Sequence, residues 1–431
     1  IGRLVGSEMC IRDRVLGAWF FMAKKFKKLT DRYKSITITD YLVSKLKPKT
    51  NHLRYLSSLF LTFFIIIYVS AQIDATGSAF EAFMDWNYFT GAVLGYFIVL
   101  AYVVFGGFIA VAWSDLIQGS LMFLALVILP VIGYYSFNGE FQILEGLNKI
   151  DRGLISPWGS GGFNLINLST IVGYLCIGLA FLGSPQIFVR FMSIKNEQEI
   201  NKGRWVAVLF TFITDSCAVL IGMMARYFFT ENGVEVESIL GNNGQNSLIM
   251  MVENLLPLLF IGFYMAVVLA AIMSTVDSLL VLASSAFARD IYQNIYNPKV
   301  EINKLTFISK VTTFIMASLA LVVAITVANL TPERTIFWFV LVGFHGIAAS
   351  FCPTIILSLF WKGLSETGAI ASMIVGFLGV LIFKFIIPNI EPYGIYFNNI
   401  AELAPALLLG LFTGYVFSIL YPNTDLKKEL D

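Results

Sequence analysis

Residues 270–280 read AAIMSTVDSLL, a stretch in which three hydroxyl side chains and an acid interrupt an otherwise apolar run. The apolar residues on both sides predict a helix that crosses a bilayer, which requires about 20 such residues. Positions spaced i, i+3, i+4 and i+7 share one face of a helix. A stripe of oxygen atoms therefore faces one neighbour near the middle of the membrane. The residues on this face are Ala271, Ser274, Thr275 and Ser278.

The composition of the whole chain is that of a polytopic membrane protein. Of 431 residues, 57% are hydrophobic and only 13% are charged, and the mean hydropathy is +0.77. The hydrophobic share and the mean hydropathy exceed those of soluble globular domains, and the charged share falls below theirs. The net charge of +1 leaves no basic face for nucleic acid. Four cysteines without CxxC spacing and two histidines predict neither a disulfide framework nor a metal centre built from these residues.

Ten apolar segments have the length of a transmembrane helix. The loop of residues 24–49 is rich in lysine and arginine, which places it in the cytoplasm by the positive-inside rule. The later loops alternate in charge accordingly, and the C-terminus is also expected in the cytoplasm. The predicted spans are 53–82, 88–107, 109–137, 163–191, 205–229, 250–290, 303–328, 335–361, 367–387 and 402–421.

The two ends of the chain differ from the rest. Residues 1–14, IGRLVGSEMCIRDR, have neither the apolar core nor the cleavage site of a signal peptide, and we expect them to be a non-native or unstructured leader. The apolar piece that begins at Val15 looks like the end of a helix whose start is missing, so truncation at the N-terminus is expected. Residues 422–431 are expected to form a cytoplasmic tail.

Several acids lie inside the predicted spans. An acid at the centre of a membrane helix costs roughly 2.5 to 3.5 kcal/mol on insertion scales and indicates function by default. Asp277 is one of them, and Asp115 in VAWSDLIQG is its expected partner. Ser278 is expected at a similar depth in the membrane to Asp115. Hydroxyl, carbonyl and carboxylate oxygens suit an alkali cation. Serine and threonine also bond to carbonyls of their own helix and allow close packing, so the hydroxyls alone leave both roles open.

A third feature is AFLGSPQIF at 180–188, where Gly183 and Pro185 interrupt a span. Proline removes a backbone donor, so the helix is expected to kink or unwind. Such breaks mark binding sites in transporters, although a plain kink is the alternative. In the span of residues 53–82, Tyr68 and Gln72 form an i, i+4 polar pair that either packs or lines a pocket.

Four motifs together resemble the sodium/solute symporter family, most closely the sodium/proline symporters. They are GGFIAVAWSDLIQGSLM, LGSPQIFVRFM, LAAIMSTVDSLLVLASSAFARDIY and WKGLSETGAIASMIVG. The resemblance implies an all-α integral membrane protein with the inverted-repeat, leucine-transporter-like fold. About ten complete helices of an expected thirteen would be present. Residues 15–421 would form the transmembrane domain, without its first two helices and most of the third.

The resemblance also implies roles for individual residues. The main sodium site would use the Ala271 carbonyl with Ser274 and Thr275. The closest proline symporters usually carry a neutral hydroxyl residue at Asp277, and around the broken helix they carry Trp, Tyr and Gln where this chain has Ile177, Phe181 and Ser184. A possible second cation site comprises Asp115, Asp277 and Ser278. The expected substrate site comprises Tyr68, Gln72, Phe181, Ser184 and Pro185.

The expected function is sodium-coupled import of a small organic solute, most closely proline or a related amino acid, by alternating access in the plasma membrane. Pantothenate, a sugar, a carboxylate or an osmolyte are the alternative solutes within the same family. A cation channel would favour repeated filter loops, and an enzyme would need a nucleophile with a base; neither is visible. The expected partners are the solute, sodium ions and lipid, with Na⁺ as coupling ion, no other cofactor and no nucleic acid. The sequence specifies no oligomeric state.

Overall fold

The structure is a computed structural model that describes residues 13–136, 142–156, 158–159, 161–230, 235–332 and 334–423. Residues 1–12 of the expected leader and 424–431 of the expected tail lie outside this range. All regular elements in the described ranges are helical. The all-α prediction is therefore confirmed for them.

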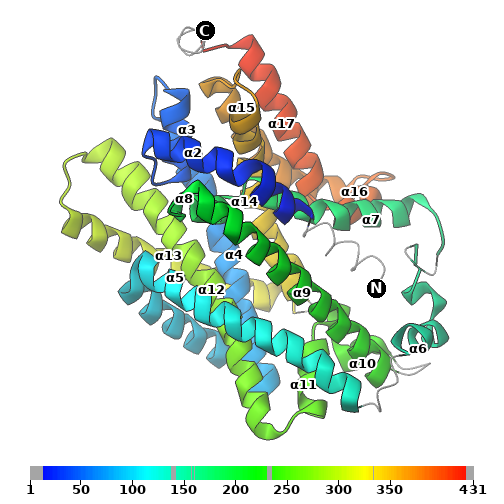
Figure 1. Cartoon of the computed structure of the whole chain (residues 1–431). Coiled ribbons are helices and arrows are strands. Elements are labelled where there is room, and N and C mark those ends of the chain that lie inside the picture. Colours follow the sequence, from blue (N-terminus) through cyan, green and yellow to red (C-terminus); the bar gives the residue numbers. More distant parts are fainter. Residues whose placement is uncertain are drawn as a thin grey trace.

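The elements follow one another as helices joined by short connections (Figure 1). In the first half these are η1 (Ala18–Met22), α2 (Ala23–Tyr33), α3 (Ile38–Leu46), α4 (His52–Met84), α5 (Tyr88–Ser136), α6 (Ile143–Ile150), η2 (Arg152–Leu154), α7 (Leu165–Ile177), η3 (Gly178–Leu182), α8 (Pro185–Ser193) and α9 (Glu197–Phe229). In the second half they are α10 (Val236–Leu240), η4 (Asn242–Gly244), α11 (Ser247–Leu255), α12 (Leu258–Ser285), η5 (Ala286–Tyr296), α13 (Ile302–Leu330), α14 (Ile336–Phe360), α15 (Glu366–Leu381), η6 (Ile382–Ile386), η7 (Ile387–Asn389), α16 (Gly394–Ile400) and α17 (Leu403–Leu420).

Nine segments of the described chain are long and apolar enough to cross a membrane. A shorter apolar helix, Tyr88–Ala101, lies where one of the ten predicted spans begins. Large apolar side chains cover the outside of these segments, as expected where lipid is the solvent. The nine are His52–Met84, Val111–Ser136, Leu165–Ser193, Glu197–Phe229, Leu258–Tyr296, Ile302–Leu330, Ile336–Phe360, Glu366–Asn389 and Leu403–Leu420.

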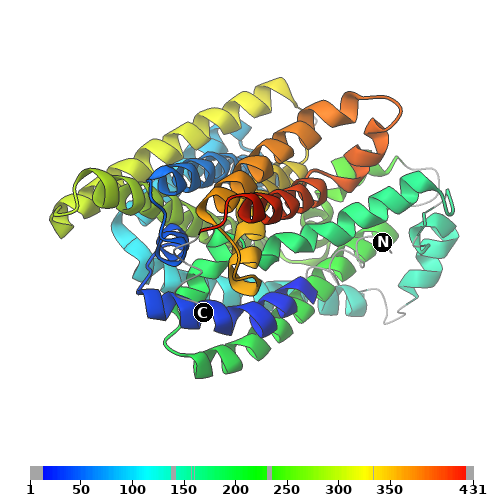
Figure 2. The ribbon, with the colours of Figure 1, turned by 90° about the horizontal axis from the view of Figure 1, so that it is seen from above.

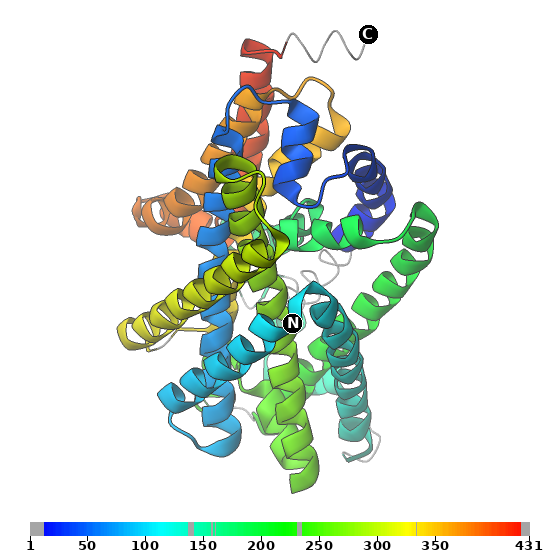
Figure 3. The same cartoon turned by 90° about the vertical axis from the view of Figure 1, so that its left-hand side faces the viewer.

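Two predicted boundaries differ from the structure. The expected break between spans at residues 106–107 is absent from the backbone, because α5 stays helical from Tyr88 to Ser136; Figure 3 shows its two parts inclined to each other. The predicted span 250–290 is divided at Pro257, which has extended geometry and caps the start of α12. Proline lacks an N–H and crowds the preceding turn, so α11 cannot continue through it.

Helices α4 and α14 are the most buried of the long helices, and α9 is the least buried. Glycines allow α14 to approach α4 closely. A Cβ atom at Gly343 would lie 2.7 Å from the Cα of Tyr68, and one at Gly346 would lie 2.1 Å from the Phe64 ring. Side chains at these positions would therefore separate the two central helices, and small residues serve this purpose in membrane bundles.

The predicted cytoplasmic segments gather at one end of the molecule. In Figures 1 and 3, α2, α3 and the final turns of α17 lie at the same end. There the Glu366 carboxylate at the start of α15 accepts hydrogen bonds from the Lys49 backbone N–H at 2.9 Å and the Thr50 hydroxyl at 2.8 Å. Figure 2, the view from above, shows α6 and α13 on opposite sides of the bundle.

Candidate functional site

The predicted sodium residues bring three oxygen atoms together on α12. The Ser274 hydroxyl donates to the Ala271 carbonyl at 2.9 Å, and the Thr275 hydroxyl donates to the same carbonyl at 3.2 Å. All three residues are partly buried. These are the bonds that serine and threonine make in helices generally. A hydroxyl that donates its proton still has lone pairs directed outward, so the same arrangement leaves oxygen ligands available to a cation.

The predicted second cation site contains a positive side chain. Asp115 Oδ2 accepts from Arg190 Nη2 at 2.8 Å and from the Ser278 hydroxyl at 3.4 Å. The same guanidinium nitrogen lies 2.8 Å from Ser278 Oγ. Asp115 and Ser278 are therefore brought together as predicted, and Arg190 holds a positive charge between them. Sequence reasoning did not place Arg190 at this site.

Asp277 is fully buried on the adjacent position of α12. Its Oδ1 accepts a hydrogen bond from the backbone N–H of Ser278. Ser278 thus connects the two acids, since its N–H serves Asp277 and its hydroxyl serves Asp115. The predicted partnership of the two carboxylates runs through this serine.

A cavity of about 980 Å³ adjoins this group and is lined in part by Asp115, Arg190 and Ser278. Gln186 also lines it, and neither polar atom of its buried amide has a hydrogen-bond partner among the described residues. A buried amide without partners is costly, so this wall of the cavity is suited to a polar occupant. Gln186 was missed by sequence reasoning, although it stands four residues before Arg190 on α8, which places both on one face.

The predicted interruption at 180–188 is confirmed. Helix α7 ends at Ile177, the tighter turn η3 follows, and Pro185 begins α8. Gly183 has φ = +157°, and a Cβ there would lie 2.8 Å from the Cα of Cys352 on α14. This conformation and this proximity both favour glycine. In Figure 1, α7 lies nearly horizontally, whereas α4 runs from top to bottom.

The carbonyl of Ala180 within the break is held by two side chains. It accepts a hydrogen bond from the Ser184 hydroxyl at 2.6 Å and one from the Cys352 thiol at 3.4 Å. Ser184 and Cys352 are both fully buried. The Cys352 thiol therefore fastens the broken segment to α14, and the Ala180 carbonyl is satisfied as membrane depth requires.

Two of the predicted substrate residues meet on an aromatic side chain that sequence reasoning did not select. The Phe344 ring of α14 lies 6.1 Å from the Tyr68 ring and 5.5 Å from the Phe181 ring, measured between centroids. Aromatic rings at such separations interact favourably. Gln72, one turn beyond Tyr68, makes no side-chain hydrogen bond to the part of the chain that is described.

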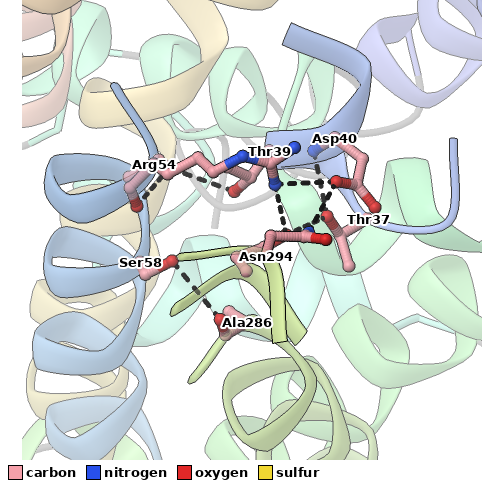
Figure 4. Close-up of polar contacts among 9 residues, drawn as sticks. Thr37, Thr39, Asp40, Arg54, Ser58, Ala286 and Asn294 are labelled. Carbon is pink, nitrogen blue, oxygen red and sulfur yellow. Dashed lines mark hydrogen bonds and ion pairs between the residues drawn. The ribbon is translucent and has the colours of Figure 1, made fainter. Parts of the chain in front are cut away.

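A cluster of charges joins α3, α4 and η5 at the predicted cytoplasmic end (Figure 4). Arg54 Nη1 lies 2.8 Å from Asp40 Oδ1 and 3.3 Å from Asp290 Oδ1. The Thr37 hydroxyl donates to Asp290 at 2.8 Å, and the Asn294 amide donates to Asp40 at 3.2 Å. We call these five residues the cytoplasmic cluster.

Two further observations define the position of the cytoplasmic cluster. The Ser58 hydroxyl donates to the Ala286 carbonyl at 3.4 Å, which is a second link between α4 and the end of α12 (Figure 4). Thr37 also lines the 980 Å³ cavity. The cluster therefore stands at the boundary of this cavity, and two of its five residues lie on η5, which directly follows the helix of the predicted sodium residues.

A second ion pair fastens the second half of α4. Arg334, just before α14, pairs with the buried Asp74 through Nη2, and its Nε lies 3.0 Å from Asp74 Oδ2. The Tyr88 hydroxyl donates to the other oxygen of the same carboxylate. A bidentate arginine contact of this kind is strong and directional. Helix α4 is therefore tied to neighbouring elements by buried charges near its start and in its second half.

Apolar spanning helices, a broken helix and an oxygen-lined helix beside a large cavity define a membrane transporter of the leucine-transporter-like fold. The chain belongs to the sodium:solute symporter family, whose model matches residues 8–376. It is thus a sodium-coupled symporter of the plasma membrane and not an enzyme.

Individual relatives agree with this assignment. The chain is 30% identical over 374 residues to the high-affinity proline transporter PutP of Bacillus subtilis, covering 85% of this chain and 75% of that protein. It is 31% identical over 432 residues to sodium/proline symporter 2 of Staphylococcus saprophyticus, covering 96% and 80%. A solved structure of a Na⁺-coupled sialic acid symporter in a substrate-bound, outward-open state matches the fold with a TM-score of 0.74 and 16% identity, covering 98% of this chain and 84% of that one.

Proposed function

We propose that this protein imports proline or a closely related amino acid together with sodium. The observation that carries the proposal is the convergence of the Ser274 and Thr275 hydroxyls on the Ala271 carbonyl of α12. Relatives that are named proline transporters match most of the chain at about 30% identity, which supports the choice of solute.

In this proposal sodium is cargo that binds at Ala271, Ser274 and Thr275. The ligands are a carbonyl and hydroxyls, which are hard oxygen donors and suit an alkali cation. Bound sodium would draw these oxygens inward and fix the middle of α12. Coupling then arises because sodium and solute bind one of two conformations more tightly than the other. Each inward charge contributes about 2.3 kcal/mol per 100 mV of membrane potential.

Asp115, Asp277 and Ser278 form the second cation site of this proposal. Because the Arg190 guanidinium contacts both Asp115 and Ser278 at 2.8 Å, a second sodium binds these oxygens only after the guanidinium moves away. Arg190 therefore acts as a competing internal cation. Its position at the wall of the large cavity gives it room to withdraw.

The solute is proposed to bind where the broken helix faces α4, with Tyr68, Gln72, Phe181, Ser184 and Pro185 as its surroundings. Phe344 would complete the apolar side, because its ring contacts those of Tyr68 and Phe181. The ring carbons of proline suit such an aromatic wall. Solute release would proceed through the large cavity towards the end of the molecule that holds α2, α3 and the C-terminus, which we assign to the cytoplasm.

The test is uptake of a panel of radiolabelled solutes by the full-length protein in proteoliposomes with an inward sodium gradient. The panel includes proline, other amino acids, pantothenate, a sugar and a carboxylate. Saturable proline uptake that disappears when potassium replaces sodium is expected. Uptake of proline without sodium, or sodium-driven uptake confined to another class of solute, contradicts the proposal.

A variant examines the sodium site itself. Ser274→Ala combined with Thr275→Ala should raise the sodium concentration for half-maximal uptake, because two hydroxyl ligands are lost. Proline binding at saturating sodium should change much less. Ser169→Ala is a matched control, since its hydroxyl also donates to a carbonyl of its own helix but lies away from α12. An unchanged sodium dependence in the double variant contradicts the assignment.

A further inference from the structure

A second cavity, of about 340 Å³, lies between α7, α14, η6, α16 and the start of α17. It shares no lining residue with the 980 Å³ cavity, and it includes none of the residues assigned above to sodium or to the solute. Its volume falls within the range of about 300 to 1,000 Å³ that is usual for small-molecule sites. The cavity therefore has the size of a binding site of its own.

The wall of this cavity carries a buried carboxylate. Glu402 is 3% exposed, and its Oε1 lies 2.7 Å from His345 Nδ1. Burial by itself raises the pKa of Glu402, but the hydrogen bond and charge of His345 and the charge of Lys384 outweigh burial and hold the pKa at about 2. The carboxylate is therefore ionised at physiological pH, and His345 Nδ1 donates to it.

Lys384 supplies the opposite charge. Its Nζ lies 3.9 Å from Glu402 Oε2, which is beyond hydrogen-bond distance. The ammonium group makes no hydrogen bond to any residue that the structure describes, and it lies 5.9 Å from the centre of the Trp338 ring. The side chain is only 29% exposed. A partly buried ammonium without an acceptor is unfavourable, so the Lys384 ammonium is prepared to receive a negative group.

The arrangement of these charges selects among possible occupants. An anion alone would satisfy Lys384 but would approach the Glu402 carboxylate. A cation alone would satisfy Glu402 Oε2 but would approach the Lys384 ammonium. A zwitterion avoids both repulsions, because its carboxylate turns to Lys384 and its ammonium to Glu402. The lining also contains Trp338, Phe383 and Phe397, whose rings suit apolar carbon atoms and, for the ammonium, a cation–π contact.

We propose that this cavity is a second binding site for a zwitterionic amino acid, held between Lys384 and Glu402. The class of ligand rests on the proposed function, whereas the charges and the cavity do not. The proposed topology places the start of α17 on the extracellular side, so the amino acid would meet this site, which α7 also lines, before it reaches Tyr68 and the break at 180–188.

The test is equilibrium binding of radiolabelled L-proline to the purified full-length protein in nanodiscs with saturating sodium. Two proline molecules per protein are expected. Lys384→Met should weaken one of the two sites about 10- to 100-fold, the effect of losing a charge-assisted hydrogen bond, and leave the other unchanged. Lys362→Met is the matched control, because Lys362 is exposed and does not line the cavity. Glu402→Gln should act like Lys384→Met, and if its loss of the His345 contact prevents folding, the lysine variant decides.

Competition with fragments of the ligand tests the charge argument. Pyrrolidine lacks the carboxylate and cyclopentanecarboxylate lacks the ammonium, so both should displace proline from this site at least 10-fold less well than proline itself. Equal competition by either fragment overturns the zwitterion assignment. A stoichiometry of one with intact sodium-driven proline uptake overturns the second site and leaves the proposed function standing. Absence of sodium-driven uptake of any zwitterionic amino acid overturns both.

Discussion

The cytoplasmic cluster predicts a large cost for the change Arg54→Gln. Arg54 contacts Asp40 at 2.8 Å and the fully buried Asp290 at 3.3 Å. Without the guanidinium, Asp290 keeps the Thr37 hydroxyl but faces the Asp40 carboxylate without a positive charge between them. Breaking a buried ion pair by removing one partner costs about 3 to 5 kcal/mol, whereas exposed pairs contribute about 0 to 1 kcal/mol.

Burial decides between these two magnitudes. The side chains of Arg54, Asp40 and Asp290 are 14%, 17% and 0% exposed, so the larger value applies and we expect a loss of about 3 kcal/mol or more in the free energy of unfolding. Lys149 and Glu145 form a matched control, since they pair at a similar distance of 2.9 Å but are 71% and 59% exposed. Lys149→Gln should cost far less than Arg54→Gln, because water and salt screen an exposed pair.

The assay is denaturant unfolding of the purified protein in one detergent, for the unchanged protein and both variants. A double-mutant cycle of Arg54→Gln with Asp290→Asn isolates the pair. In the Asp290→Asn background the arginine change should cost about 2 kcal/mol less, because position 290 then carries no buried negative charge that the Asp40 carboxylate could repel. If Arg54→Gln costs no more than Lys149→Gln, the cluster is not a buried electrostatic tie and the reasoning fails.

Three other outcomes are expected. Asp277→Ser should change the number of sodium ions per solute or the pH dependence of uptake if this acid belongs to a second cation site, and an effect on neither would remove it from that site. The pKa of Glu402 is lowered to about 2 from its ordinary 4.5, so its contribution to stability is complete above about pH 4.5 and is lost as the pH falls towards 2. When the pH is lowered from 6 to 3, the midpoint temperature of thermal unfolding should therefore fall less for Glu402→Gln than for the unchanged protein. Gly343→Ala should lower the free energy of unfolding by about 1 to 3 kcal/mol through overpacking, since the added Cβ would lie 2.7 Å from the α4 backbone. Gly119→Ala is the control, because a Cβ there would meet no atom within 4 Å.

Features encoded by local periodicity were predictable. The spans followed from apolar length, and the oxygen stripe followed from the spacing of Ser274 and Thr275, because helical geometry relates residues within a few positions. The break near Pro185 followed from the missing backbone donor. The boundary at Pro257 was missed because the apolar run continues across it, so hydropathy alone did not separate α11 from α12.

Contacts between distant parts of the chain were not predictable. Arg190 meets Asp115 across 75 positions and Arg54 meets Asp290 across 236, and no local pattern pairs such residues. The aromatic contact of Phe344 with both Tyr68 and Phe181 likewise depends on how α14 packs against α4 and the broken helix.

By itself, the sequence determined that this is an all-helical membrane protein with an oxygen-lined helix and a broken one, because these properties are set by composition and by the period of the helix. Only the tertiary structure decided that a guanidinium stands at the predicted second cation site, and that Glu402 and Lys384 face one cavity. The physical reason is that the charge and shape of a site are set by side chains from several helices, whose packing no single helix specifies.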